Sequence, residues 1–365
     1  MTADAFDPVA FLERAVRTPS HESVTAMREF VVETLADHGV DASVDGAGNV
    51  LATRGEGRPR HLLNTHLDTV RPHVPFSREG EAVRGRGACD AKGPLAAFLA
   101  AFLRADPEGS LALTLSPDEE TLSTGAAHLA FADGDRRETL RGVGAVDGVV
   151  VGEPTGLDVC TAAKGRYQAT VTLSGASAHA ADPGDGVNAV AAAAPALAAI
   201  SAFDEGADPH PDLGAPSLTP TTIAGGESTN QVPAECRIVV DRRPVPPESA
   251  GAFRTRLRRV VREAVPAAVG VDVSLTDREA PFLGPWSTPT ADPLVERLAA
   301  ASGGAVRPFT AATEASYFAQ FAPTVVFGPG ELVDEDGAVA HSDREYVRVG
   351  AVRAAADALA RTLRA

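Results

Sequence analysis

The chain has 365 residues, enough for about two domains whose cores need no disulfide support. Its 44% hydrophobic and 22% charged residues are ordinary for a globular protein and argue against extended disorder. The 33 basic and 49 acidic residues give a net charge of −16, a sign that repels phosphates and anionic lipid, so we expect neither nucleic-acid nor membrane partners.

Residue usage also points to a compartment. The only lysines are Lys92 and Lys164, and scarce lysine with excess acid is typical of a salt-adapted cytoplasmic protein, in which salt screens the surface charge. The first seven residues carry acids rather than the basic stretch of an export signal, and no apolar run approaches the ~18 residues of a membrane span. Cys89, Cys160 and Cys236 lack CxxC spacing, which favours reduced, buried thiols. We therefore expect a cytoplasmic protein.

Strand and helix patterns alternate in the first and last parts of the chain. Apolar residues recur at helical spacing across residues 7–39, and Gly39 supplies a stop. Buried strands are predicted at 61–64, 110–116, 148–152 and 324–328, with helices at 95–105 and 124–133. This alternation predicts an α/β domain with a mostly parallel central sheet.

The middle of the chain has a different pattern. Its predicted elements are half-exposed strands at 167–173 and 237–242, helices at 187–200 and 250–265, and proline- or glycine-rich loops at 208–220 and 243–247. We therefore expect an inserted α+β domain at 165–275. Residues 1–164 and 276–365, on either side of this insertion, would together form one discontinuous catalytic domain.

Histidine or glutamate follows four of the predicted strands. His66 follows the first, Glu119 and Glu120 the second and Glu153 the third, while His341 lies beyond the fourth, after an acidic loop. In open α/β sheets, ligands bind at the carboxyl ends of the strands. Each residue alone has an ordinary explanation as a surface or core group. Their convergence on one edge favours a shared site.

Asp90 adds a further carboxylate. It lies in GRGACDAKG, before a helix expected near Pro94, and the string matches neither a dinucleotide fingerprint nor a phosphate loop. Two imidazoles and three carboxylates are the ligand set of a dinuclear zinc site with one bridging carboxylate. The adjacent Glu119 and Glu120 would then supply one ligand and one general base. Asp68 can hydrogen-bond the far ring nitrogen of His66.

At these residues the chain resembles the acetylornithine deacetylase, succinyl-diaminopimelate desuccinylase and carboxypeptidase family of dinuclear zinc hydrolases, over nearly its whole length. The motifs that carry the resemblance are NTHLDTV, GRGACDAKG, SPDEET, VVGEPT and AHSDREYV. The resemblance implies two zinc ions, with cobalt or manganese as alternatives. It also implies a role for each residue: His66 and Glu153 on one ion, Glu120 and His341 on the other, Asp90 as the bridge, Glu119 as the base and Asp68 as the orienting residue.

The family also inserts a lid and dimerisation domain, so the resemblance implies a homodimer formed through residues 165–275. Its motifs match at SAHAADPGDGVNAV, GGESTNQVP and VDRRPVP. By the resemblance, His179 reaches the active site of the partner subunit and helps to hold the oxyanion, while Asn230 and Arg242 contact substrate. The ordinary alternatives are that His179 caps the following turn and that Arg242 pairs with Asp241 or another acid.

The segment TEASYF, followed by FGPG, is similar to the acetylornithine deacetylase branch. This predicts a small-molecule substrate, N-acetyl-L-ornithine, cleaved to L-ornithine and acetate in arginine biosynthesis. Glu314 would receive the substrate ammonium and Arg242 the α-carboxylate. The acidic loop at 331–339 departs from that branch and suits either salt adaptation or a reshaped pocket mouth.

Several alternatives stay open. Within the enzyme class they are a succinyl-diaminopimelate desuccinylase, a hydrolase of carrier-protein-linked lysine or ornithine, and a dipeptidase. An acidic carrier would be repelled by the negative surface of this chain. Outside that class, the chain could be a non-catalytic binding protein or an acidic protein that holds no metal.

Overall fold

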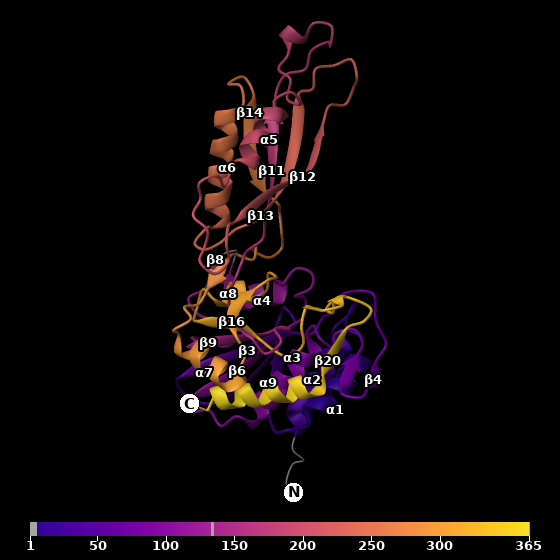
Figure 1. The fold of residues 1–365 in the computed structure, drawn as a ribbon, viewed down its shortest axis with the longest axis vertical. Coiled ribbons are helices and arrows are strands. Elements are labelled where there is room, and N and C mark those ends of the chain that lie inside the picture. Colours follow the sequence, from indigo (N-terminus) through magenta and orange to yellow (C-terminus); the bar gives the residue numbers. More distant parts are fainter. Residues whose placement is uncertain (1–5, 133–134, 365) are drawn as a thin grey trace.

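The computed structural model describes residues 6–132 and 135–364. The chain forms two parts: a main part that contains the first and last described segments, and an inserted part that extends away from it (Figure 1). Within the described residues, no helix is both long enough and apolar enough to cross a bilayer.

One sheet organises the main part, in the strand order β1-β2-β6-β3-β9-β17-β10-β15 with β16 beside β10. Its central strands β6, β3, β9 and β17 run parallel, and the pairs β2–β6 and β10–β17 that flank them are antiparallel. The strand bounds are β1 Ala42–Val44, β2 Val50–Gly55, β3 Arg60–His66, β6 Ser110–Ser116, β9 Gly148–Gly152, β10 Val159–Ala163, β15 Trp286–Ser287, β16 Val306–Phe309 and β17 Thr324–Phe327. The predicted mostly parallel central sheet is confirmed.

Helices cover both faces of this sheet, which explains why its central strands are nearly continuous apolar runs. One apolar core lies under α1, α2, α3, α7 and α9, and a second lies under α4 and α8. The helix bounds are α1 Pro8–Arg17, α2 Thr25–Asp37, α3 Lys92–Arg104, α4 Thr124–Ala130, α7 Pro293–Ser302, α8 Ala315–Phe318 and α9 Val349–Thr362. The helical pattern predicted over 7–39 forms two helices, α1 and α2.

Local signals explain where these first helices begin and end. The Asp7 side chain accepts the backbone N–H of Val9 at 2.9 Å, and Pro8 occupies the first turn of α1. After α2, Gly39 has a φ of +73°, a left-handed conformation that glycine adopts without steric cost.

The inserted part is an antiparallel sheet, β12-β13-β11-β14, with α5 and α6 packed on it around a core of its own. Its bounds are β11 Tyr167–Ser174, α5 Ala193–Ser201, β12 Ser217–Gly225, β13 Glu235–Arg243, α6 Ala250–Ala264 and β14 Gly270–Leu275. Alternate residues of β11 are buried, as the polar–apolar pattern predicts. The division of the chain at 164/165 and 275/276 stays a prediction.

Two predictions for this region are wrong in detail. The helix predicted over 187–200 begins only at Ala193, and β12 begins inside the segment predicted as a loop. β12 is an edge strand whose residues are almost all exposed, so it lacks the apolar run that would reveal it. Short elements complete the chain: β4 Ser77–Glu79, β5 Ala82–Arg84, β7 Phe131–Ala132, β8 Asp135–Arg136, the 3-10 helix Pro183–Asp185, β18 Val333–Asp334, β19 Gly337–Ala338 and β20 Tyr346–Arg348.

Candidate metal centre

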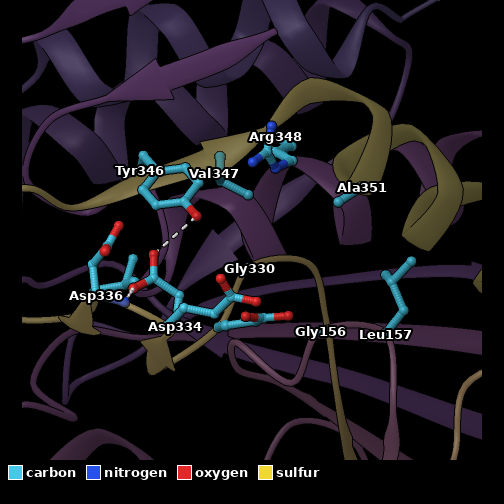
Figure 2. Close-up of a pocket in the computed structure, with 12 residues that line it drawn as sticks. Gly156, Leu157, Gly330, Asp334, Asp336, Tyr346, Val347, Arg348 and Ala351 are labelled. Carbon is cyan, nitrogen blue, oxygen red and sulfur yellow. Dashed lines mark hydrogen bonds between the residues drawn. The ribbon is translucent and has the colours of Figure 1, made fainter.

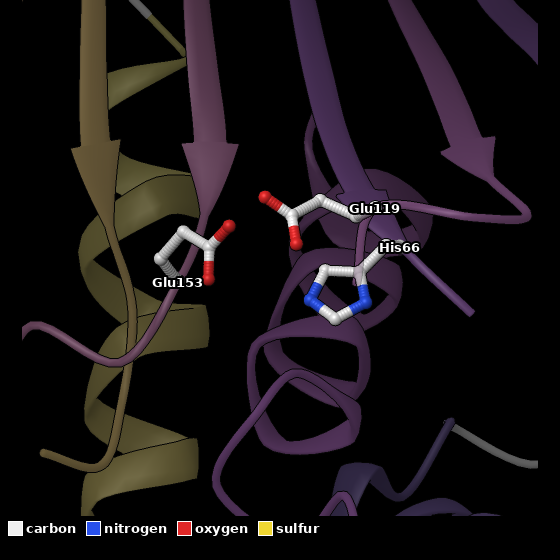
Figure 3. A group of neighbouring side chains, drawn as sticks. All are labelled: His66, Glu119 and Glu153. Atoms are coloured by element: carbon white, nitrogen blue, oxygen red, sulfur yellow. The ribbon is translucent and has the colours of Figure 1, made fainter. Parts of the chain in front are cut away.

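The parallel strands deliver three side chains to one point. His66 ends β3, Glu119 follows β6 and Glu153 follows β9, and these side chains lie next to one another (Figure 3). Each offers a ligand atom within 4.8 Å of the others, and His66 forms a second such group with Asp90 and Glu120. His66, Asp90 and Glu153 are almost completely buried.

Asp90 lies between the two histidines. Its Oδ1 is 3.2 Å from His66 Nε2, and its Oδ2 is 3.2 Å from His341 Nε2. The same His341 nitrogen is 3.0 Å from Glu120 Oε1. The structure therefore brings all five predicted metal ligands into one cluster, with Asp90 in the central position that a bridging carboxylate requires.

Asp68 connects this cluster to the Glu119–Glu120 backbone. Its Oδ1 is 3.2 Å from His66 Nδ1 and accepts the backbone N–H of Glu119 at 3.0 Å. Its Oδ2 accepts the backbone N–H of Glu120, also at 3.0 Å. One buried carboxylate thus fixes both the ring of His66 and the start of the loop that carries the two glutamates.

The carboxylates of the cluster strongly perturb one another. Burial, together with the charge of Glu153, raises the pKa of Glu119 well above its usual range. Burial and the charge of Asp90 do the same to the pKa of Glu153. Hydrogen bonds to Asp90 and Glu120 raise the pKa of His341 to about 10. The cluster therefore favours added positive charge, and its carboxylate and imidazole donors fit divalent cations such as zinc.

Two further groups lie beside the cluster. Thr313 Oγ1 donates to Glu153 Oε1 at 3.0 Å. Glu314, 1% exposed, accepts a hydrogen bond from Ser116 Oγ at 2.7 Å through Oε2, while its Oε1 has no hydrogen-bond partner among the described residues. Burial raises the pKa of Glu314 to about 8. The predicted ammonium acceptor thus has one buried oxygen to which no described residue donates a hydrogen bond.

His179 and Asn230 lie together on the inserted part. Ala180 donates its backbone N–H to the Asn230 carbonyl at 2.9 Å, and both residues are exposed. The His179 ring also accepts the backbone N–H of Ala181 at 3.1 Å, which is the turn-capping contact expected as the ordinary alternative. Their predicted contacts with a partner subunit and with substrate stay predictions.

The structure corrects the prediction for Arg242. Its side chain is 2% exposed and points into the core of the inserted part, where it pairs with Asp204 at 2.5 Å and Glu248 at 2.8 Å. The next residue, Arg243, faces the other side of β13 with 43% of its side chain exposed. Sequence reasoning missed Arg243, although successive residues of a strand face opposite sides and Val240 marks the apolar side.

The acidic loop forms a separate feature. Its hairpin, β18–β19, borders a cavity of about 490 Å³ (Figure 2). Asp334 and Asp336 line this cavity, and Asp334 accepts a hydrogen bond from Tyr346 at 3.1 Å. None of the described residues that line the cavity is a candidate metal ligand. The loop therefore borders a pocket other than the metal centre.

Comparison with known proteins decides the family. Residues 62–365 match the description "Peptidase family M20/M25/M40". The chain belongs to the M20 peptidase family. Members of this family are metal-dependent hydrolases, typically with two metal ions, so the predicted enzyme class and family are confirmed.

Individual relatives agree with the M20 assignment. The chain is 33% identical, over 94% of its length and 92% of the relative's, to a Pyrobaculum aerophilum protein named as a LysW-lysine/LysW-ornithine hydrolase. It is 32% identical, over 85% of its length and 81% of the relative's, to an acetylornithine deacetylase of Myxococcus xanthus. The solved structure of the Bacillus cereus aminopeptidase PepT has a TM-score of 0.76 at 18% identity, covering 98% of this chain and 97% of that one, and so shares the fold.

Proposed function

We propose that this M20 hydrolase cleaves the amide bond to the α-nitrogen of an acylated ornithine, releasing ornithine. The unpartnered, buried Oε1 of Glu314 carries the proposal, because a substrate ammonium would satisfy it beside the metal ligands. The names of both relatives support the same leaving group, since each contains ornithine.

Five residues would hold the metal ions. We assign His66 and Glu153 to one ion, Glu120 and His341 to the other, and Asp90 to both, in agreement with the central position of Asp90. Zinc suits this donor set, with cobalt or manganese as alternatives. When bound, the ions supply Lewis-acid polarisation of the carbonyl and lower the pKa of water.

The remaining steps fall to the side chains of the chain. Glu119 takes a proton from the attacking water and returns it to the leaving nitrogen as the carbon–nitrogen bond breaks. Asp68 keeps His66 and the Glu119 backbone in place for this transfer. We assign the oxyanion contact to His179, and the substrate α-carboxylate to Asn230 and Arg243, with Arg243 replacing Arg242 because it is the exposed arginine.

We further propose a homodimer formed through the inserted part. Edge strand β12 is exposed along Ser217–Gly225, and Ile223 is 53% exposed. The outer edge of an exposed edge strand is a surface on which another strand can pair. A cytoplasmic location and salt adaptation complete the proposal, supported by the net charge of −16.

Two acyl groups are candidates. Acetyl follows from the TEASYF segment and from relatives named as acetylornithine deacetylases. A carrier-linked acyl group is favoured by the Pyrobaculum relative, which matches the chain at higher identity and over a larger share of it.

A substrate panel at high salt, with and without a chelator, tests the proposal. The panel contains acetylornithine, LysW-linked ornithine, succinyl-diaminopimelate and a dipeptide. We expect chelator-sensitive release of ornithine from one of the first two, and the faster of them identifies the acyl group. Faster cleavage of succinyl-diaminopimelate or the dipeptide, or cleavage indifferent to chelation, would contradict it.

A further inference from the structure

A buried ion pair lies immediately behind the metal centre. Arg86 Nη1 is 2.6 Å from Glu345 Oε2, and the two side chains are 1% and 0% exposed. Neither residue belongs to the predicted ligand set. Burying two charges is costly, and a well-packed apolar pair is often as stable or more so. The pair therefore calls for a role other than stability alone.

Glu345 holds the loop that carries the bridging aspartate. Its Oε1 accepts the backbone N–H of Cys89 at 3.0 Å and that of Asp90 at 3.1 Å. These two bonds and the ion pair use both carboxylate oxygens. A shift of Glu345 would shift the Asp90 backbone, and with it the carboxylate that lies between His66 and His341.

Arg86 extends the same connection to the other loop. Its guanidinium donates to the Ser342 carbonyl at 3.3 Å and the His341 carbonyl at 3.5 Å, while Nε donates to the Pro72 carbonyl at 3.0 Å. His341 has a φ of +64°, a conformation that a non-glycine residue adopts only when its surroundings hold it there. Arg86 supplies part of that hold.

We propose that Glu345 and Arg86 are positioning residues that set the separation of Asp90 and His341. They would thereby set the affinity for the ion assigned to Glu120 and His341, called the second ion below. The inference rests on the proposed metal ligands. The two residues act differently. Glu345 fixes the bridging aspartate, which would serve both ions, whereas Arg86 holds the His341 loop through the His341 and Ser342 carbonyls. Groups behind a metal site typically change affinity by roughly 10–100-fold.

Zinc binding to the metal-free chain tests this without reference to turnover. Equilibrium dialysis against zinc, with elemental analysis, gives the affinity for each ion in the wild type, Arg86→Lys and Glu345→Gln. We expect two ions in the wild type. Arg86→Lys keeps the positive charge beside Glu345 but loses the guanidinium N–H groups that reach the carbonyls. We expect the second ion to bind roughly 10–100-fold more weakly and the affinity for the first ion to stay unchanged. In Glu345→Gln the affinity for both ions should fall.

Arg78→Gln is the matched control, because Arg78 lies on the neighbouring strand β4, is 30% exposed and pairs with Glu13. Its zinc affinities should equal those of the wild type. Thermal unfolding of the metal-free variants tests whether they fold. If one does not, Arg86→Gln replaces Arg86→Lys, and Glu345→Asp replaces Glu345→Gln. If both Arg86→Lys and Glu345→Gln bind two ions with wild-type affinity, this inference is overturned and the proposed metal centre is not. Failure of the wild type to bind zinc would instead refute the proposed metal centre.

Discussion

Arg242 and Arg243 are consecutive in β13, and their guanidinium groups lie on opposite sides of the strand. Arg242 is enclosed with Asp204 and Glu248, and its guanidinium carbon lies 5.0 Å from the Phe203 ring centroid. Arg243 is held at 2.7 Å by Asp241 on the exposed side. Two residues with the same chemistry therefore have different surroundings: Arg242 is enclosed, whereas Arg243 is exposed, as the substrate contact that we propose for it requires.

Replacing each arginine by methionine separates these roles. Arg242→Met leaves two carboxylates without their partner, so we expect it to lower the free energy of unfolding by about 3 kcal/mol, the low end for a buried pair because Asp204 and Glu248 are partly exposed. Arg243→Met should change stability by less than about 0.5 kcal/mol and raise KM roughly 10-fold. Urea unfolding and steady-state kinetics measure both. A stable Arg242→Met with raised KM would restore Arg242 as the substrate contact.

The adjacent glutamates form a second informative pair. Glu119→Gln removes the proposed base but no ligand, so we expect two ions still bound and kcat lowered by roughly 10²–10⁴-fold. Glu120→Gln removes a ligand 3.0 Å from His341, so we expect the second ion to be weakened. Elemental analysis and kcat on the same samples separate the two outcomes. Loss of metal in Glu119→Gln, with metal retained in Glu120→Gln, would reverse the assignment.

The strands that build the site could be predicted from sequence because they are buried on both faces. Residues 110–116 and 148–152 were predicted and observed with the same limits, since a continuous apolar run identifies a central parallel strand. The chain order of His66, Glu119 and Glu153 after those strands then placed them on one edge. Topology, rather than any single residue, made this part of the site predictable.

Other features depended on tertiary contacts that a local pattern does not contain. Charged residues are almost never fully buried unless they are paired, so burial of Arg86 or Glu345 is predictable only if the partner is known. The two partners are 259 residues apart in the sequence, so no local pattern indicates the pair. The error at Arg242 has a different origin, because strand alternation, which is visible in the sequence, places Arg242 on the same buried side of β13 as Val240. β12 gives no strand signal in the sequence, because an exposed edge strand lacks an apolar run.

Glu314 gives a prediction about substrate recognition. In Glu314→Gln the amide can still accept the Ser116 hydroxyl. The variant cannot ionise, whereas in the wild type a bound ammonium would lower the raised pKa of Glu314 and favour its carboxylate form. We expect KM for the ornithine substrate to rise roughly 10-fold or more, the usual effect of losing a charged hydrogen bond. N-acetylnorvaline, which lacks the side-chain amine, should show no difference between variant and wild type. Equal effects on both substrates would exclude the ammonium contact.

Acid sensitivity should arise in part at His61, far from the metal ligands. His61 begins the buried run of β3, and burial together with the charge of Arg297 lowers its pKa. Because the unfolded chain then takes up the proton more readily, the contribution of neutral His61 is complete above about pH 6.5 and is lost as pH falls toward the lower folded pKa. One such group can contribute at most about 1.4 kcal/mol per pH unit.

His61→Asn should remove this contribution. We expect the free energy of unfolding of the wild type to fall more steeply between pH 7 and pH 5 than that of the variant, measured by urea unfolding at fixed salt. His128→Asn serves as the control, because the His128 side chain is 32% exposed on α4. If the curves of the wild type and His61→Asn are parallel, the acid sensitivity of the fold arises elsewhere. If only the curves of the wild type and His128→Asn are parallel, the difference between pH 7 and pH 5 arises from the buried imidazole at the start of β3.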